Sequence, residues 1–259
     1  MRGLLRDVIS YICQYLSKRD LDNLSLCCKQ LYNIALETKK KTCYLEIGWT
    51  TKELPMDGFK RFLVYNGHKL GLLPTNATHL VFGHNFNQSV DKLPPNVTHL
   101  TFGTCFNQSV DHLPTNVTHL TFGWNFNQPV DKLPTNVTHL TFGKCFNQPM
   151  GKLPPNVTHL SYFDQSVDKL PPNVTHLKFG KRFNRFVDDL PQSVTHLTFG
   201  GWFKKSLDHL PANVTELRLH IDYKLPLPQR PGLKVYRGGV LVSNKYFFLE
   251  HKGVNLLCQ

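Results

Sequence analysis

Residues 113–132 read LPTNVTHLTFGWNFNQPVDK, and close copies of this stretch follow one another along most of the chain. Each copy opens with Leu-Pro, at residues 73, 93, 113, 133, 153, 170, 190 and 210, so the step is 20 residues except for one step of 17. A fixed period of about 20 residues is typical of a solenoid, in which each coil buries its apolar face only by stacking on its neighbours. The sequence therefore predicts a repeat solenoid.

Hydrophobic spacing within the unit predicts one short strand per coil. Leu120 and Phe122 alternate with polar residues, so both should point inward while His119 and Thr121 point outward. Gly123 ends the strand and permits a turn. The proline of Leu-Pro suits the connecting turn, because it has no N–H to give to a strand ladder. We therefore expect a mainly β, leucine-rich-repeat-like solenoid of parallel strands spaced about 4.8 Å apart.

Stacking of the coils should place equivalent residues in rows. We expect a histidine row and a mostly threonine row on the outer sheet face, and an asparagine row that hydrogen-bonds backbone between coils. The asparagine row consists of Asn87, Asn107, Asn127, Asn147 and Asn184. At the 17-residue step HLTFGKCFNQP becomes HLSYFDQS, so Phe163-Asp164 should take the Phe-Asn place and the curvature of the solenoid should change.

The sequence predicts that the chain consists of four segments. These are a helical segment at 1–41, degenerate N-terminal coils at 42–72, the regular solenoid at 73–220, and degenerate C-terminal coils or a cap at 221–259. Degenerate strands are expected within 43–49, 60–67, 233–239 and 244–250. Atypical terminal coils are expected because the end of an array must not present a naked strand edge.

Residues 1–41 have helical rather than repeat character. Apolar residues at 5, 8, 9, 12 and 16 follow the spacing of an amphipathic helix, and a second apolar face runs from Leu21 to Ala35. A few helices this short make no core of useful size by themselves. They must therefore pack on the first coils, on a partner, or on both.

Charge and composition narrow the class of protein. Only 3 alanines and 5 glutamates stand against 19 asparagines and 18 phenylalanines, which excludes a mostly helical chain. The formal net charge is +12, of which residues 161–259 carry +6 (14 basic minus 8 acidic residues). This distribution favours an acidic partner near the C-terminal end over a function defined by charge throughout the chain.

Cysteine usage and hydropathy predict an intracellular protein, in the cytoplasm, with no membrane association. No apolar stretch approaches the ~18 residues of a membrane helix, and the N-terminus lacks a secretory signal. Seven cysteines without CxxC spacing are interpreted as reduced thiols. Nine Asn-x-Ser/Thr sequons fall at repeated places, so we interpret their asparagines as structural.

Two stretches resemble known families. Residues 4–35, LLRDVISYICQYLSKRDLDNLSLCCKQLYNIA, resemble an F-box, although the family's opening Leu-Pro is Leu4-Leu5 here. FNQP at 126–129 and 146–149 resembles the core of the FNIP repeat, a short leucine-rich-repeat-like unit. The combination resembles the F-box and FNIP repeat-containing proteins of large amoeba-infecting DNA viruses.

The resemblance implies a function without chemistry of its own. In that family the F-box docks on the small adaptor subunit of a cullin-RING ubiquitin ligase and the repeats capture a target, so this chain would be a non-catalytic substrate receptor that needs no cofactor. The implied adaptor-binding residues are Leu4, Leu5, Val8, Ile9, Ile12, Leu16, Leu21, Leu24 and Leu31. The competing interpretation is that these helices only cap the solenoid.

Target recognition should use positions that vary while the scaffold repeats, together with basic residues that break the rows. The candidates are His84, Thr104, Trp124, Lys144, Lys178, Lys181, Arg182 and Trp202. Lys178, Arg182, Lys204 and Arg218 are expected to form a basic strip. Trp124 and Trp202 are candidate anchors, because tryptophan is enriched at binding hot spots, or else they pack on neighbouring coils.

Other classes of function have weaker support. One aspartate per coil, as at Asp131, and one histidine per coil indicate scaffold rather than a catalytic or metal site, because a site would stand out as an exception. No GxxxxGK[ST], HExxH or GxSxG motif occurs. A basic nucleic-acid-binding solenoid stays as an alternative, although acidic residues interrupt its basic stretches. A repeat scaffold independent of ubiquitin also remains open.

Overall fold

The structure is a computed structural model, and it describes residues 45–47, 61–64, 73, 75–149 and 151–242. The helical segment predicted at 1–41 and the strand predicted within 244–250 lie outside the described residues.

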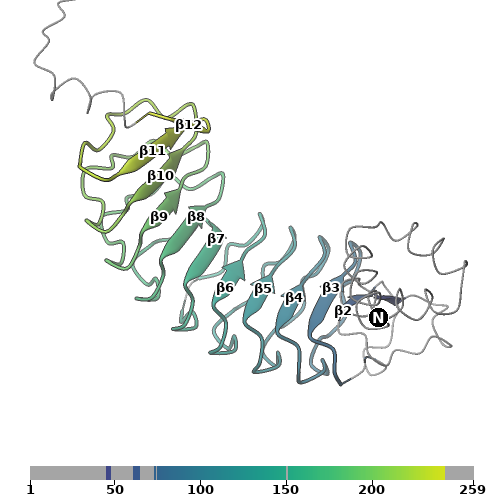
Figure 1. The fold of residues 1–259 in the computed structure, drawn as a ribbon. Coiled ribbons are helices and arrows are strands. Elements are labelled where there is room, and N and C mark those ends of the chain that lie inside the picture. The colour runs from purple at the N-terminus through teal and green to yellow at the C-terminus, as the bar shows by residue number, and fades with distance from the viewer. Residues whose placement is uncertain (1–44, 48–60, 65–72, 74, 150, 243–259) are drawn as a thin grey trace, which may run out of the picture.

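Twelve strands of the described part form one sheet, and their order in the sheet is their order in the chain (Figure 1). They are β1 Leu45–Ile47, β2 Arg61–Val64, β3 His79–Phe82, β4 His99–Thr101, β5 His119–Thr121, β6 His139–Thr141, β7 His159–Phe163, β8 His176–Phe179, β9 His196–Thr198, β10 Glu216–Leu219, β11 Lys234–Arg237 and β12 Val240–Leu241. Consecutive strands are parallel as far as β11. The predicted parallel solenoid is confirmed, including the degenerate strands within 43–49, 60–67 and 233–239.

The last described strand was not predicted from the sequence. β12 pairs antiparallel with β11, and Gly238 and Gly239 connect them with φ angles of +57° and +85°. Two consecutive residues of positive φ form the tight turn that matches the twist of a hairpin, and glycine adopts them without strain. The hairpin therefore ends the described sheet by reversing the chain direction.

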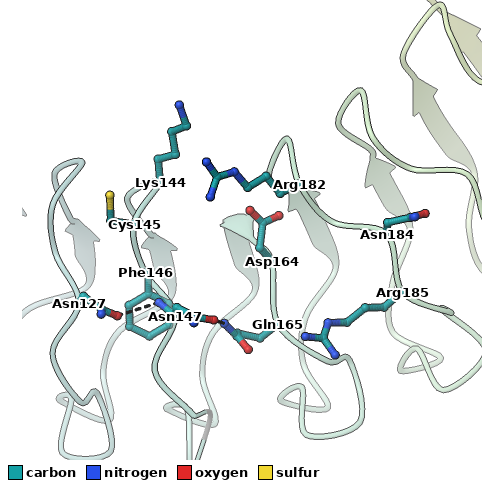
Figure 2. A pocket seen from close by; sticks show the side chains of 10 residues that line it. All are labelled: Asn127, Lys144, Cys145, Phe146, Asn147, Asp164, Gln165, Arg182, Asn184 and Arg185. Carbon is teal, nitrogen blue, oxygen red and sulfur yellow. Dashed lines mark hydrogen bonds between the residues drawn. The ribbon is translucent and has the colours of Figure 1, made fainter.

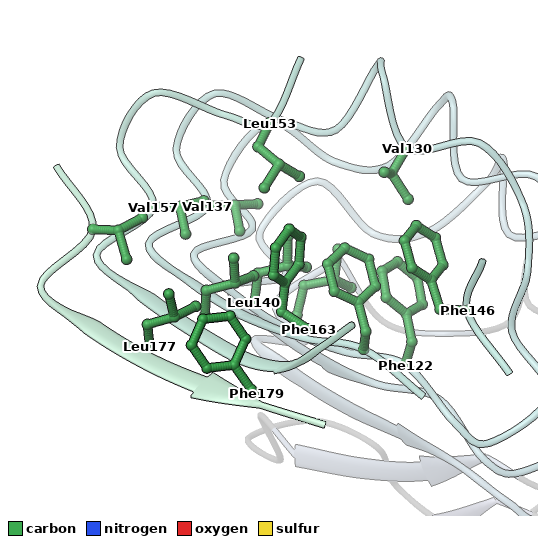
Figure 3. Packing of buried hydrophobic residues seen from close by; sticks show 14 of the residues in the cluster. Phe122, Val130, Val137, Leu140, Phe146, Leu153, Val157, Phe163, Leu177 and Phe179 are labelled. Carbon is green, nitrogen blue, oxygen red and sulfur yellow. The ribbon is translucent and has the colours of Figure 1, made fainter. Parts of the chain in front are cut away.

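Between Leu73 and Val235 the interior is a column consisting mainly of leucine, phenylalanine and valine side chains, part of which is drawn in Figure 3. Leu120 pairs in register with Leu140, and both are buried, while His119 pairs with His139 at the half-buried outer face. Phe126 has no exposed surface, and its ring lies 3.7 Å from Phe122 between ring centroids. The predicted inward and outward positions are confirmed, because a strand alternates its side chains between two faces.

The repeated glycine after each strand is required by close packing between coils. An ideal Cβ on Gly123 would lie 1.9 Å from the carbonyl oxygen of Gly103. Gly123 does not have a positive φ angle, so the turn itself would accept another residue. Its neighbour in the next coil, Gly143, meets the same obstacle at 1.8 Å. The turn predicted at this glycine is confirmed. Glycine is required there because the neighbouring coil leaves no room for a side chain.

The 17-residue coil departs from the regular pattern at Tyr162. β7 bulges between Ser161 and Phe163, Tyr162 has a φ of +56°, and Phe163 pairs in register with Phe179. Phe163 therefore takes the place of the strand phenylalanine, so the prediction that it takes the Phe-Asn place is wrong for this residue. The bulge absorbs part of the deletion by moving Phe163 into the core, where it is 1% exposed. The array visibly changes direction at this coil, as predicted (Figure 1).

Candidate protein-interaction surface

The turns that follow the strands form one long ridge of exposed side chains, which we call the turn ridge. Its exposed residues are His84, Trp124, Lys144, Lys181, Arg182 and Trp202, and it also contains Thr104, which is half-buried. Backbone hydrogen bonds connect successive turns, as from the Asn125 N–H to the Thr104 carbonyl (2.9 Å) and from the Cys145 N–H to the Trp124 carbonyl (3.0 Å). The repeated scaffold thus fixes the backbone while the side chains project away from it.

Both tryptophans of the turn ridge are exposed rather than packed in the core. Trp124 is 51% exposed and Trp202 is 54% exposed. The Lys144 ammonium lies 4.1 Å from the centroid of the Trp124 ring, which is within cation–π range. Trp124 and Lys144 therefore present a joint apolar and cationic surface that spans two coils.

Seven of the eight predicted target-binding residues lie on the turn ridge, and Lys178 does not. Lys178 projects from the outer sheet face on β8, where its ammonium lies 4.7 Å from the centroid of the Tyr162 ring. Arg218 also projects from that face, on β10, whereas Arg182 and Lys204 follow the turn glycines. The four residues expected as one basic strip therefore occupy two separate places.

The asparagine row is structural, as predicted. The Asn127 N–H donates to Oδ1 of Asn107 at 2.9 Å, and the Asn147 N–H donates to Oδ1 of Asn127 at 2.8 Å. A second row consists of sequon asparagines, each of which donates its Nδ2 to a carbonyl of the preceding coil, as Asn136 does to Thr115 at 2.8 Å. These bonds between coils satisfy backbone groups that the short strands leave unpaired.

The histidine row is held in one protonation pattern by its threonine neighbours. Thr118 Oγ1 donates to the Thr98 carbonyl at 3.2 Å, so at 2.9 Å it accepts from Nδ1–H of His119. The imidazole rings stack with centroids 4.1 Å apart, as His119 does on His139. Burial, then the neighbouring imidazoles, lower the pKa of His159 to about 4. His159 is therefore neutral near neutral pH, and its ring serves as part of the scaffold.

Metal-binding groups and membrane helices were searched for over the described ranges. There, no three His, Cys, Asp or Glu side chains come together in a way suited to hold a metal ion. No helix in the same part of the chain is long and apolar enough to cross a membrane.

A hollow interrupts the turn ridge at the 17-residue coil (Figure 2). Its volume is about 710 Å³, and its lining residues are Asn127, Lys144, Cys145, Phe146, Asn147, Asp164, Gln165, Arg182, Asn184 and Arg185. Sequence reasoning found Lys144 and Arg182 but missed Arg185 and the inward role of Asp164. The only sequence signal for the hollow was the shortened step itself.

Asp164 lies in the floor of this hollow. Gln165, which follows it, donates Nε2 to Oδ1 of Asn147 at 3.0 Å, as Gln128 does to Asn107, whereas the Asp164 carboxylate itself lies against Gly180 of the next turn. Burial raises the pKa of Asp164, although the backbone N–H groups of the next turn, at Phe183 and Arg182, act to lower it. Its Oδ1 is buried without a hydrogen-bond partner.

The fold and the exposed turn ridge define a class of protein, namely a solenoid for protein–protein interaction. The FNIP Repeat family matches residues 65–105, 106–145, 129–161 and 186–222, which together are just over half of the chain. The chain therefore belongs to the FNIP repeat family. The F-box domain family matches residues 3–42, a segment outside the described residues. This combination indicates a protein-interaction adaptor.

A solved structure has the same kind of fold. It is the crystal structure of CroV588, reported as a novel circular LRR protein, with a TM-score of 0.62 and 34% sequence identity. The match covers 70% of this chain and 30% of that chain, so this chain spans about a third of its length. The leucine-rich-repeat-like prediction is thereby confirmed. No curated protein matches the chain significantly.

Proposed function

We propose that this chain is a substrate receptor of a cullin-RING ubiquitin ligase, with the F-box bound to the small adaptor subunit and the turn ridge bound to a target protein. The main support for this proposal is that an F-box match at residues 3–42 precedes a solenoid whose variable side chains lie on one ridge. In such a chain the F-box binds the adaptor, which many receptors share, and the turn ridge binds the target, which is specific to this receptor.

The physical role of such a receptor is to raise effective concentration. A target held on the solenoid is delivered to the ubiquitin-charged enzyme as if the two were one molecule, which favours transfer without any catalytic group on the receptor. F-box and repeat families are typically interaction modules, which supports this division of labour.

The turn ridge is suited to target capture because its anchors are exposed and its backbone is rigid. Trp124 and Trp202 offer large apolar surfaces, and tryptophan is enriched among residues that dominate binding energy. Their backbone is held by hydrogen bonds between coils, such as the Trp202 N–H to the Lys181 carbonyl at 3.1 Å. Little conformational entropy is therefore lost when a target binds.

The experiment separates the two halves of the proposal in the full-length chain. Leu16→Glu places a charge on the proposed adaptor face and should abolish co-elution with purified adaptor subunit on gel filtration, while targets captured from cells remain bound. Trp124→Ala with Trp202→Ala should leave adaptor binding unchanged and reduce target capture at least about tenfold, in line with hot-spot losses of 1.4 kcal/mol or more.

Phe186→Ala is the matched control, because Phe186 is also an exposed aromatic residue, at 63%, but lies outside the turn ridge. It should change neither interaction. Adaptor binding that survives Leu16→Glu would contradict docking through this face. A wild-type chain that captures targets from cells but does not bind the adaptor would instead indicate a scaffold independent of ubiquitin.

A further inference from the structure

The hollow exists because the 17-residue coil lacks most of its turn. On one side the ladder of turn hydrogen bonds reaches Cys145, and on the other it continues from Lys181 to Trp202. Between them, β7 runs through the bulge directly into Asp164, so no turn side chain stands between Lys144 and Arg182. A volume of about 710 Å³ opens at this gap in the ridge.

The rim of the hollow is cationic. Lys144 comes from the coil before the gap, whereas Arg182 and Arg185 come from the coil after it, and all three side chains are exposed. In Figure 2, Arg182 turns back over Asp164 towards the coil of Lys144. Within the described residues, no salt bridge joins Arg182 or Arg185 to an acidic side chain. With one carboxylate in the floor, the formal charge of the lining is 3 − 1 = +2.

Arginine suits one class of ligand in such a place. The planar guanidinium matches a carboxylate in a two-point hydrogen bond, and a charged bond of this kind is about twice as strong as a neutral one. The amide groups of Asn147 and Asn184 also line the hollow and are suited to a peptide backbone. The Trp124 ring does not line the hollow, but it lies against Lys144 and offers an apolar contact beside that lysine.

We propose that the hollow binds an acidic segment of the target protein, with its carboxylates held by Lys144, Arg182 and Arg185. This inference rests on target capture by the turn ridge and names the chemistry of what is captured. A protein segment fits better than a nucleic acid, because a strand of phosphates needs a continuous basic path. Of the other basic residues that break the rows, Lys178 and Arg218 lie on the outer sheet face, and Lys204 lines a separate hollow together with an acidic residue, Asp222.

Substitution of Asp164 should change binding in the opposite direction to substitution of the cationic residues. Its carboxylate lies in the floor, where it repels an incoming carboxylate. Asp164→Asn removes that charge and leaves the size of the side chain almost unchanged. The variant should therefore tighten the binding of an acidic segment, an effect that mere damage to the fold would not produce.

The experiment measures binding of a fluorescein-labelled hexaglutamate peptide to the full chain by fluorescence anisotropy. Arg182→Gln and Arg185→Gln should each weaken binding by about fivefold, the upper end for a solvent-exposed ion pair, and Asp164→Asn should tighten it by at least about threefold. Lys169→Gln is the matched control, because Lys169 is exposed and carries the same charge but does not line the hollow. It should change affinity by less than about twofold.

Two results would overturn the proposal. Equal weakening by Lys169→Gln and Arg182→Gln would indicate attraction to net charge alone. Tighter binding of a single-stranded oligonucleotide of equal charge, with the same response to the variants, would assign the hollow to nucleic acid. Adaptor binding by the same variants, measured on gel filtration, should be unchanged. Its absence in the wild-type chain would refute the ligase role and leave the peptide result intact.

Discussion

An alanine at Gly123 should force two coils of the solenoid apart. Its Cβ would lie 1.9 Å from the Gly103 carbonyl oxygen and 2.4 Å from the carbonyl carbon. Carbon atoms approach carbonyl oxygens in proteins to about 3.3–3.6 Å, so the two backbones must separate by more than about 1 Å. Two hydrogen bonds flank the contact, Phe102 N–H to Thr121 O at 2.8 Å and Asn125 N–H to Thr104 O at 2.9 Å.

A separation of that size takes both bonds out of hydrogen-bonding range. Each lost bond costs about 0.5–1.5 kcal/mol, and overpacking adds about 1–3 kcal/mol. We therefore expect Gly123→Ala to lower the free energy of unfolding by about 2–6 kcal/mol. Gly201→Ala is the control, because its Cβ would meet nothing closer than a His220 ring carbon at 3.5 Å. It should change stability by no more than about 0.5 kcal/mol.

Urea unfolding followed by circular dichroism distinguishes these outcomes. Stability in a solenoid is a sum over coils and their interfaces, so a break at one interface should also split the transition or broaden it. Equal unfolding midpoints for Gly123→Ala and Gly201→Ala would refute the argument that backbone contact between coils requires glycine.

The remaining predictions concern the core and the histidine row. Phe126→Ala should cost about 3–5 kcal/mol in urea unfolding, because Phe126 is fully buried between the rings of neighbouring coils, and a loss below about 1 kcal/mol would contradict that packing. Stability should fall as the pH drops from 6.5 to about 4, since the pKa of His159 is lowered to about 4 and the unfolded chain then binds more protons. His159→Gln should flatten this pH dependence, and an unchanged slope would show that the row does not titrate as argued.

Most of the fold could be predicted from the pattern of residues within one repeat unit. The spacing of Leu120, Phe122 and Phe126 predicted their burial, and the regular recurrence of asparagine predicted the hydrogen-bonded asparagine row. Prediction worked here because each coil contacts only its neighbours, so that one unit contains the pattern of the whole array. The prediction was wrong at Phe163, because β7 bulges there and the spacing of apolar residues does not reveal a bulge.

The interaction surface was predicted in part for a similar reason. Variation between repeats located Trp124 and Arg182 on the turn ridge, since a position that changes while the scaffold persists is free of the stacking requirement. Lys178 was selected on a different ground, as a basic residue that breaks the threonine row, and it lies on the outer sheet face with that row. Reasoning from variation missed Arg185, because variation shows that a residue is unconstrained and does not show which residues it meets.

The sequence by itself determined a parallel solenoid with one strand per coil, defined which residues point inward, and marked the place of its irregular coil. Those features depend on periodicity, and periodicity is a property of the chain order. Only the tertiary structure decided that Lys144, Arg182 and Arg185 surround one hollow over Asp164. The hollow forms because the bulged coil brings side chains of its two neighbouring coils to face each other across it. Whether they do so depends on the distances between the three backbones, which the order of residues does not give.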